Sequence, residues 1–273
     1  PGIRTDSDMA TYGYEFKPWI GTNQFVDAPM IKKYLNETLE EDGTKEKIIF
    51  NTWVEKIEWS SKNKNWTLST KNNKSGSETK MTAKFVITCC GYYDHKQGYI
   101  PEFKNVNDFK GTFIHPQFWP EDLDYRDKNI IIIGSGATAV TLVPSLAKGG
   151  AKHVKLLQRS PSYFVILPRK DDMIHQLSKV MPVEKAHQII RWKNIKVAEI
   201  ATTFAQKFPK LAKQVFINGI KKALPKGYDI KKHFTPRYYP MEQRMCVAPD
   251  GDFFETISSL SLIHISEPTR RHL

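Results

Sequence analysis

The sequence predicts an α/β protein organised around a dinucleotide-binding unit, and three observations support this fold class. Residues 129–133, NIIII, form an apolar run with the length of a buried parallel strand. The next residues, GSGATA, place Gly134, Gly136 and Ala139 in the GxGxxA spacing of a dinucleotide turn. A helical pattern over 138–146 then leads to a second apolar strand, which completes a predicted βαβ unit.

The small residues of this turn leave space for a diphosphate. Gly134 allows the tight change of direction from strand to helix, and Gly136 lets a pyrophosphate approach the backbone. Ala139 lets the helix pack closely on the strand, so that free N–H groups at the helix start can bind the anion. The predicted cradle comprises Gly134, Ser135, Gly136, Ala137, Thr138, Ala139 and Val140.

The residue after the second strand selects the dinucleotide. This strand, KHVKLL at 152–157, ends about twenty residues past the turn, where an acidic residue would bind the ribose 2′-hydroxyl of NAD. Arg159 stands there instead, and its fork of donors suits a 2′-phosphate, with Ser160 as a further donor. The sequence therefore predicts NADPH, although an ordinary surface arginine at a strand end is the simpler alternative.

Composition excludes several other classes of protein. The chain has 273 residues, 40% of them hydrophobic, which is enough for two small domains. No apolar run reaches the roughly eighteen residues of a transmembrane span, and the first residues do not resemble a signal peptide. The net charge of +12 is scattered over hairpins and helices, whereas a nucleic-acid-binding protein concentrates basic residues on one face.

The three cysteines predict neither a disulfide framework nor a metal site. Cys89 and Cys90 are adjacent in an apolar strand, and Cys246 is far away. No spacing typical of metal ligands is present, so we expect no metal. A reducing, cytoplasmic location is the corresponding expectation.

The region before the βαβ unit mixes helix and strand signals. Helical periodicity covers 29–41 and ends at Gly43, and a short parallel strand is expected at 47–50. Alternating patterns at 55–60 and 65–70, followed by a return strand at 80–88, predict a meander. Residues 71–80, rich in Ser, Asn and Lys, form the tip of one of its hairpins.

A mostly helical insertion is predicted after the βαβ unit, over 174–224. Its large apolar side chains are expected to pack as core rather than to line a cofactor pocket. These residues are Trp192, Ile195, Phe204, Phe208 and Phe216.

A second motif stands just before the first strand of the βαβ unit. Residues 109–120, FKGTFIHPQFWP, fit the pattern FxGxxxHxxxWP. Five fixed positions with uncommon residue types are hard to obtain by chance, although His115 and Trp119 could simply pack within a loop. The fixed positions are Phe109, Gly111, His115, Trp119 and Pro120.

With this motif the chain resembles the flavin-dependent Baeyer–Villiger monooxygenases, and more closely their ethionamide-activating subgroup. The resemblance covers nearly the whole chain up to about Ser259. Four phrases carry it: PGIRTDSDM at 1–9, HPQFWPEDLDY at 115–125, the 31 residues from Ile133 to Tyr163, and HFTPRYYPMEQR at 233–244.

The resemblance implies two dinucleotide-binding, Rossmann-like domains of a flavoprotein monooxygenase, the first of them incomplete. Residues 1–100 would form part of an FAD-binding domain without its N-terminal glycine loop, and 101–128 a linker with the FxGxxxHxxxWP motif. Residues 129–259 would form the NADPH-binding domain that carries the helical insertion. Residues 260–270, LSLIHISEPTR, read like one frame of a sequencing-library adapter, so a non-native tail is expected at 260–273, with a genuine polar tail as the alternative.

The resemblance also implies the chemistry. NADPH reduces FAD, the reduced flavin takes up dioxygen as a C4a-peroxide, and one oxygen atom goes into a small-molecule ketone or onto a sulfide or thioamide sulfur. The chain alone is expected to be inactive and to lack a flavin spectrum, because the first glycine loop is missing. The sequence assigns neither one of these substrates nor an oligomeric state.

Two catalytic residues are carried over from the resemblance. Arg244, in PMEQR, would stabilise anions near the flavin, and Asp6, in PGIRTDSD, would orient that arginine. The simpler alternatives are a surface arginine and a helix cap near Ser7. Three neighbours of Arg244 depart from the family phrase, because Tyr239, Met241 and Glu242 replace Asn, Trp and Asp.

Further cofactor contacts follow from the same resemblance. Arg4 and Thr5, together with Asp6, would lie against the nicotinamide half of NADPH. Val54 and Gly91 would contact FAD, as would Asp6.

Two other functions stay open. The N-hydroxylating and flavin-containing monooxygenases share a similar motif, but typically have Tyr or Phe after its Trp, so Pro120 favours the Baeyer–Villiger interpretation. A non-catalytic NADP-binding fragment is the third possibility.

Overall fold

The computed structural model describes residues 1–41, 43–259 and 262–266. The chain forms two compact units. Residues 1–34 with 120–273 make up the first, here called the dinucleotide unit, and residues 35–119 make up the second, the meander unit. Residues 1–34 thus pack with the βαβ unit, and the domain boundaries inferred from the sequence stay predictions.

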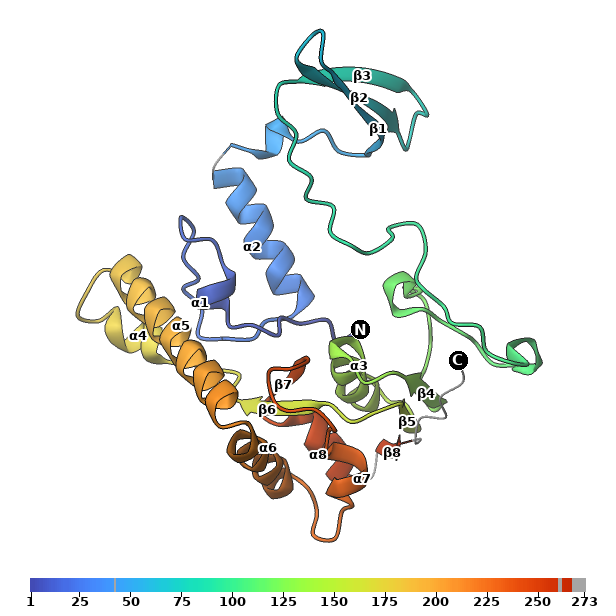
Figure 1. Cartoon of the computed structure of the whole chain (residues 1–273), viewed down its shortest axis with the longest axis vertical. Helices are drawn as coiled ribbons and strands as arrows, with labels where there is room; N and C mark the ends of the chain where they lie inside the picture. Colours follow the sequence, from blue (N-terminus) through green and yellow to red (C-terminus); the bar gives the residue numbers. More distant parts are fainter. Residues whose placement is uncertain (42, 260–261, 267–273) are drawn as a thin grey trace. The chain divides into compact units, whose positions relative to one another are not determined.

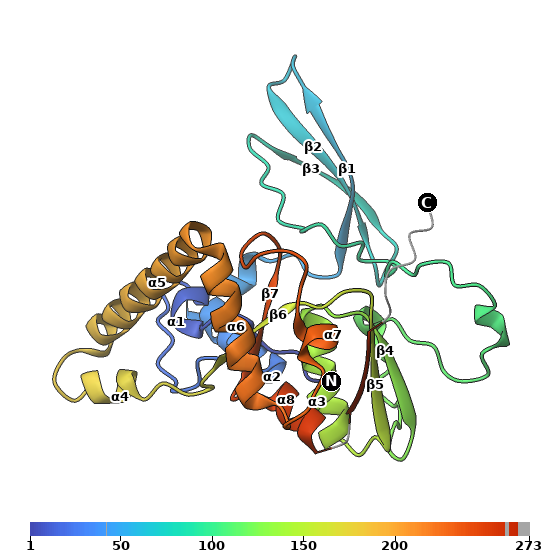
Figure 2. The same ribbon diagram turned by 60° about the horizontal axis from the view of Figure 1, so that its bottom comes forward.

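The predicted βαβ unit is present in the dinucleotide unit. Strand β4 (Asn129–Ile133) pairs in parallel with β5 (His153–Gln158), and helix α3 (Ala137–Lys148) connects them. Figures 1 and 2 both show α3 packed beside these two strands. Its inner face is fully buried, and the branched residues of β5 face it. These core residues are Val140, Val143, Leu146, Val154 and Leu156.

A third strand, β8 (Leu262–Ser266), pairs in parallel with the other edge of β5, which gives the sheet order β4-β5-β8. These five residues belong to the expected non-native tail, 260–273. The other residues of that tail lie outside the described residues. The origin of the tail stays a prediction.

A second sheet, which has two parallel strands, packs against a cluster of buried aromatic side chains. It consists of β6 (Tyr163–Leu167) and β7 (Met245–Pro249), next to α7 (Ile230–Phe234) and α8 (Asp252–Ser258). The ring centroids of Phe164 and Phe253 lie 5.0 Å apart in a stacked arrangement. Four phenylalanines are buried together here, namely Phe164, Phe234, Phe253 and Phe254.

The segment predicted to be a helical insertion forms α4 (Met173–Leu177), α5 (Val183–Lys207) and α6 (Pro209–Ala223). In both views α5 is flanked by α4 and by the short helix α1 (Met9–Tyr12). The buried residues of α5 are Ala186, His187, Ile190 and Ala205.

The expectation that the large apolar residues of the insertion pack as core is wrong for most of them. Trp192 is 64% exposed, Phe208 55%, Ile195 45% and Phe204 37%. The reason is geometric, because a helix of 25 residues extends past the short elements that cover it. Only Phe216 is partly buried, with its ring 6.1 Å from that of Tyr163.

The N-terminal segment is held by local hydrogen bonds. Helix α1 begins at Met9, and its N-cap is Asp8, whose Oδ1 accepts from the Thr11 N–H at 3.0 Å. The alternative role of Asp6 as a helix cap is therefore wrong. Met9, Val26 and Tyr34 form a buried cluster beside this helix.

The meander unit confirms the expected antiparallel sheet. Strands β1 (Thr52–Ser60), β2 (Asn65–Asn72) and β3 (Glu78–Ala83) pair in the order β1-β2-β3. The expected helix before it is α2 (Ala28–Glu41), which begins in the dinucleotide unit. After the sheet the chain forms two 3₁₀ turns, at Val106–Asp108 and Pro116–Phe118.

Two strand predictions in this unit are wrong. Residues 47–50 do not form a strand, because a 3₁₀ turn at Lys45–Lys47 and a left-handed Asn51 (φ 56°) take up this stretch. The return strand stops at Ala83 instead of 88. Ala83 pairs with Trp66, one residue from the start of β2, so the residues after it have no partner in the ladder.

Candidate functional site

The glycine turn presents unused backbone donors. Gly134 has φ +130°, a conformation that favours glycine, and no atom lies within 4 Å of where its Cβ would be. Gly136 occupies the N-cap position of α3, but it has no side chain that could accept a hydrogen bond from the first N–H groups of the helix. The first N–H groups of this helix are therefore available to an anion, as a dinucleotide cradle requires.

Side chains around the turn fix its shape. The Ser135 hydroxyl donates to the Ser160 carbonyl at 3.3 Å, and the Ser162 hydroxyl donates to the Ser135 carbonyl at 3.4 Å. The Cys246 thiol approaches the same carbonyl at 3.9 Å. The turn is thus tied to the segment after β5 and to β7.

Arg244 lies directly against this turn. Its Nη1 is 2.8 Å from the position that a Cβ on residue 136 would occupy. Only glycine leaves this space free. A permanently charged guanidinium therefore lies beside the predicted diphosphate cradle.

The residues that depart from the family phrase build the turn before Arg244. The Glu242 N–H donates to the Tyr239 carbonyl at 3.2 Å, and the Tyr239 N–H donates to the Glu242 carboxylate at 2.7 Å. Met241 has φ +71°, as expected at the third position of a type II turn that has Pro240 at its second. The changed residues still close a turn that leads Arg244 into β7.

The charges of Arg244 and Asp6 both affect the pKa of the Cys246 thiol. Burial raises the pKa of the Cys246 thiol, the charge of Arg244 lowers it, and the charge of Asp6 raises it again. The structure thus brings Arg244 to the glycine turn, whereas the placement of Asp6 beside Arg244 stays a prediction.

Arg159 and Ser160 follow β5 directly and are exposed. The carboxyl ends of the parallel strands β4 and β5 lie at one edge of the sheet, so these residues share that edge with the glycine turn. Gln158, just before them, is buried, and its side chain donates to the His233 carbonyl at 2.8 Å.

Comparison with known proteins identifies the family. The model of the flavin-binding monooxygenase-like family matches residues 9–191. The chain belongs to this family.

Two curated relatives support the assignment. The FAD-containing monooxygenase EthA of Mycolicibacterium smegmatis is 46% identical over 94% of this chain and 52% of its own length. The probable FAD-binding monooxygenase AlmA of Acinetobacter baylyi is 45% identical over 95% of this chain and 52% of its own length. The chain therefore spans about half the length of these relatives.

A solved structure supports the fold. The complex of OTEMO with FAD and NADP superposes with a TM-score of 0.75, at 18% identity, over 97% of this chain and 57% of that chain. This likeness confirms the predicted fold class, a dinucleotide-binding flavoprotein fold.

The two cofactors of the family differ in how well the described residues fit them. NADPH has a cradle, because the glycine turn meets an uncapped helix start with open space at Gly134. In the described part of the meander unit no strand runs through a glycine turn into a helix. FAD therefore finds no diphosphate cradle in that unit.

The remaining predicted site residues belong mostly to the meander unit. Val54 lies in β1 and is 44% exposed, and Gly91 has φ +70° in an exposed loop. Their proposed contacts with FAD stay predictions.

Within the FxGxxxHxxxWP motif, the phenylalanine ring packs over the glycine. A Cβ on Gly111 would lie 2.4 Å from the exposed Phe109 ring, so the ring would have to shift if another residue stood there. His115 precedes the 3₁₀ turn Pro116–Phe118, and its Nδ1 accepts from the Gln117 N–H at 3.3 Å. Gly98 leaves space for the His115 ring, because a Cβ on residue 98 would lie 2.2 Å from His115 Nδ1.

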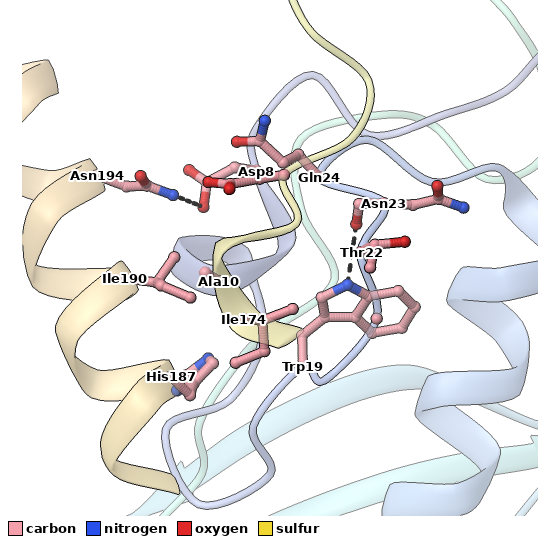
Figure 3. A pocket seen from close by; sticks show the side chains of 12 residues that line it. Asp8, Ala10, Trp19, Thr22, Asn23, Gln24, Ile174, His187, Ile190 and Asn194 are labelled. Atoms are coloured by element: carbon pink, nitrogen blue, oxygen red, sulfur yellow. Dashed lines mark hydrogen bonds between the residues drawn. The ribbon is translucent and has the colours of Figure 1, made fainter. Parts of the chain in front are cut away.

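Sequence reasoning missed a small cavity in the dinucleotide unit. It measures about 20 Å³, which admits a water molecule but no substrate. Figure 3 shows its wall, with the Asn194 amide donating to Asp8 at 2.7 Å and the Trp19 indole donating to the Asn23 carbonyl at 2.9 Å. His187 is 2% exposed, and its Nε2 has no hydrogen-bond partner among the described residues.

Arg4 and Thr5 serve packing in this structure. The Arg4 guanidinium pairs with Asp252, and the Thr5 hydroxyl accepts from the Val26 N–H at 3.2 Å. Asp252 was not predicted, since nothing in PDGD marks an ion-pair partner. Among the described residues, no cluster of three or more His, Cys, Asp or Glu could hold a metal, and no helix has the length and apolar composition to cross a membrane.

Proposed function

We propose that the protein is an FAD- and NADPH-dependent monooxygenase. It inserts one oxygen atom of dioxygen into a small-molecule ketone, as in a Baeyer–Villiger reaction, or adds it to the sulfur of a sulfide or thioamide. The observation that carries this proposal is the Arg244 guanidinium against Gly136 of the dinucleotide turn. The names of the relatives, FAD-containing and FAD-binding monooxygenases, support it.

NADPH binds across the carboxyl edge of the β4–β5 sheet. The N–H groups of the turn and of the first helical residues, within 135–139, hold its diphosphate, and Arg159 with Ser160 holds its 2′-phosphate. Thr5 and Asp6 border the nicotinamide half, beside Arg244.

Bound FAD supplies the oxygen chemistry and bound NADPH supplies the hydride. Arg244 contributes a charge that does not titrate, and it stabilises the negative charge that develops on the reacting oxygen. Asp6 holds the guanidinium in place through opposite charge. Arg244 immediately precedes β7, whose buried Cys246 thiol approaches the Ser135 carbonyl of the glycine turn at 3.9 Å.

For the chain taken by itself, we propose NADPH binding without oxygenation. The dinucleotide unit has a cradle, whereas the described meander unit has none. A reducing cytoplasm is the expected compartment, because all three cysteines are free thiols.

The test is Arg244→Ala in the full-length protein. Ester or sulfoxide formation should fall by about 100- to 1,000-fold, because one electrostatic stabiliser of the transition state is lost. The dissociation constant for NADPH, measured by fluorescence quenching, should rise far less than this, because the N–H groups of the turn and Arg159 still bind its phosphates. Arg244→Lys is the control, since it keeps the charge but loses the fork.

Retained ester formation in Arg244→Ala would show that the assignment is wrong. Oxidation of an amine to a hydroxylamine, without ester from any ketone, would instead favour the N-hydroxylating class.

A further inference from the structure

Arg4 and Asp252 form a buried ion pair between residues 248 apart in sequence. The guanidinium contacts both carboxylate oxygens, with Nη2 to Oδ1 at 3.2 Å. Each side chain is only 8% exposed. Arg169 adds a second cation at 3.4 Å from Asp252, but it is 36% exposed. The fork of Arg4 is thus already occupied within the protein.

The segment around Arg4 is held on both sides. The Thr5 N–H donates to the Val26 carbonyl at 2.9 Å, and the Ala28 N–H donates to the Ile3 carbonyl at 3.0 Å. Gly2 packs on α3, where a Cβ would lie 2.6 Å from the Thr141 carbonyl oxygen. The backbone that enters Asp6 therefore has little freedom.

The partner, Asp252, is rigidly connected to Arg244. Arg244 immediately precedes β7, and Asp252 is the first residue of α8, which follows β7 after a short turn. Gly251, at φ +73°, makes this turn possible. Strand β7 is paired along its whole length with β6, so the position of Asp252 is fixed relative to Arg244.

We propose that Arg4 and Asp252 are positioning residues, whose buried ion pair joins the segment that carries Asp6 to the β7–α8 segment that carries Arg244. The role rests on the proposed function of Asp6 and Arg244. Arg4 acts through Asp252 and does not contact the nicotinamide. The distance between the two charges at the site is set by this remote pair.

The first test is kinetic and uses the full-length protein with Arg4→Gln, Asp252→Asn and the double variant. Each single change should lower kcat for oxygenation by about 10- to 100-fold, because small misplacements at a reacting centre have effects of this size. KM for NADPH should stay within about threefold, because no contact with the coenzyme is lost. The double variant should recover part of the loss, since no charge is left buried without its partner.

The matched control is Glu255→Gln. Glu255 lies three residues further along α8 and forms an exposed pair with Lys148 at 3.8 Å. Its neutralisation removes the same charge from the same helix and should leave kcat unchanged.

The second test needs no activity and is made on the chain itself. Amide hydrogen exchange of residues 2–8 should quicken in Arg4→Gln and in Asp252→Asn, but not in Glu255→Gln. This readout separates the inference from the proposed function, because a wild-type protein without oxygenation would refute only the latter.

Three results would overturn the positioning role. The first is a raised KM for NADPH with unchanged kcat in Arg4→Gln but not in Asp252→Asn, which would indicate direct contact with the coenzyme. The second is an additive loss in the double variant. The third is unfolding of Arg4→Lys, which keeps the charge, because the pair would then support the whole fold.

Discussion

Single residues decide the geometry of the candidate site. Gly136 was predicted from spacing alone, and the structure gives it a second reason, the close approach of Arg244. The sequence could not reveal this contact, because the two residues are joined only through the packing of β7 near the turn. The roles of Asp6 and Arg244 come from resemblance to the family, whereas the approach of Arg244 to the glycine turn comes from the structure.

Gly136→Ala tests this residue directly. The added Cβ would push the Arg244 side chain away and would obstruct the diphosphate. The dissociation constant for NADPH should rise at least about tenfold, equivalent to about 1.4 kcal/mol, by fluorescence titration. Folding should be little affected, because the contacting atom is the end of a flexible side chain.

Gly219→Ala is the matched control. Gly219 lies within α6, and no atom is within 4 Å of the position that a Cβ would occupy there. Alanine at this position should stabilise the helix by up to about 1 kcal/mol and leave NADPH affinity unchanged. Equal affinity of Gly136→Ala and wild type would contradict the proposed cradle.

At the scale of elements, strong local patterns predict well and weak ones do not. The β4-α3-β5 unit follows from a branched apolar run, a glycine turn and a helical period, all of which agree. The pattern at 47–50 is equally apolar but has no partner strand among the described residues, and it forms no strand. For α5, periodicity predicts the helix correctly, but it does not predict which of its apolar side chains are buried by neighbouring elements.

Helix α5 docks on α1 through a buried histidine, and this contact should depend on pH. Burial lowers the pKa of His187 below 6.5, the neighbouring Arg191 charge lowers it further, and a bond with the Ala10 backbone and the charge of Asp8 oppose the shift. Because the unfolded chain then binds the proton more tightly, stability should fall as the pH drops below about 6.5.

Thermal denaturation of wild type and His187→Gln between about pH 5 and 7.5 measures this effect. Part of the acid sensitivity should disappear in the variant. Burial also lowers the pKa of His233, so some sensitivity should persist. Identical pH profiles would show that His187 does not carry the effect.

At the scale of the whole molecule, long-range pairs hold the dinucleotide unit together. Arg4 with Asp252, Asn194 with Asp8 and Arg191 with the Ala10 carbonyl each join segments distant in sequence. No single-sequence pattern marks such pairs, since they depend on the finished packing. The fold class was nevertheless predictable, because the dinucleotide turn and the FxGxxxHxxxWP motif are local and specific.

The most direct test of the account is calorimetric titration of the chain with NADPH and with NADH. The central claim is that Arg159 binds the 2′-phosphate of a coenzyme whose diphosphate rests on residues 134–140. Wild type should prefer NADPH by at least about tenfold, as a lost charge-assisted contact of roughly 1.5–3 kcal/mol implies, and Arg159→Ala should remove the preference. Equal affinity of the wild type for both coenzymes would contradict the account.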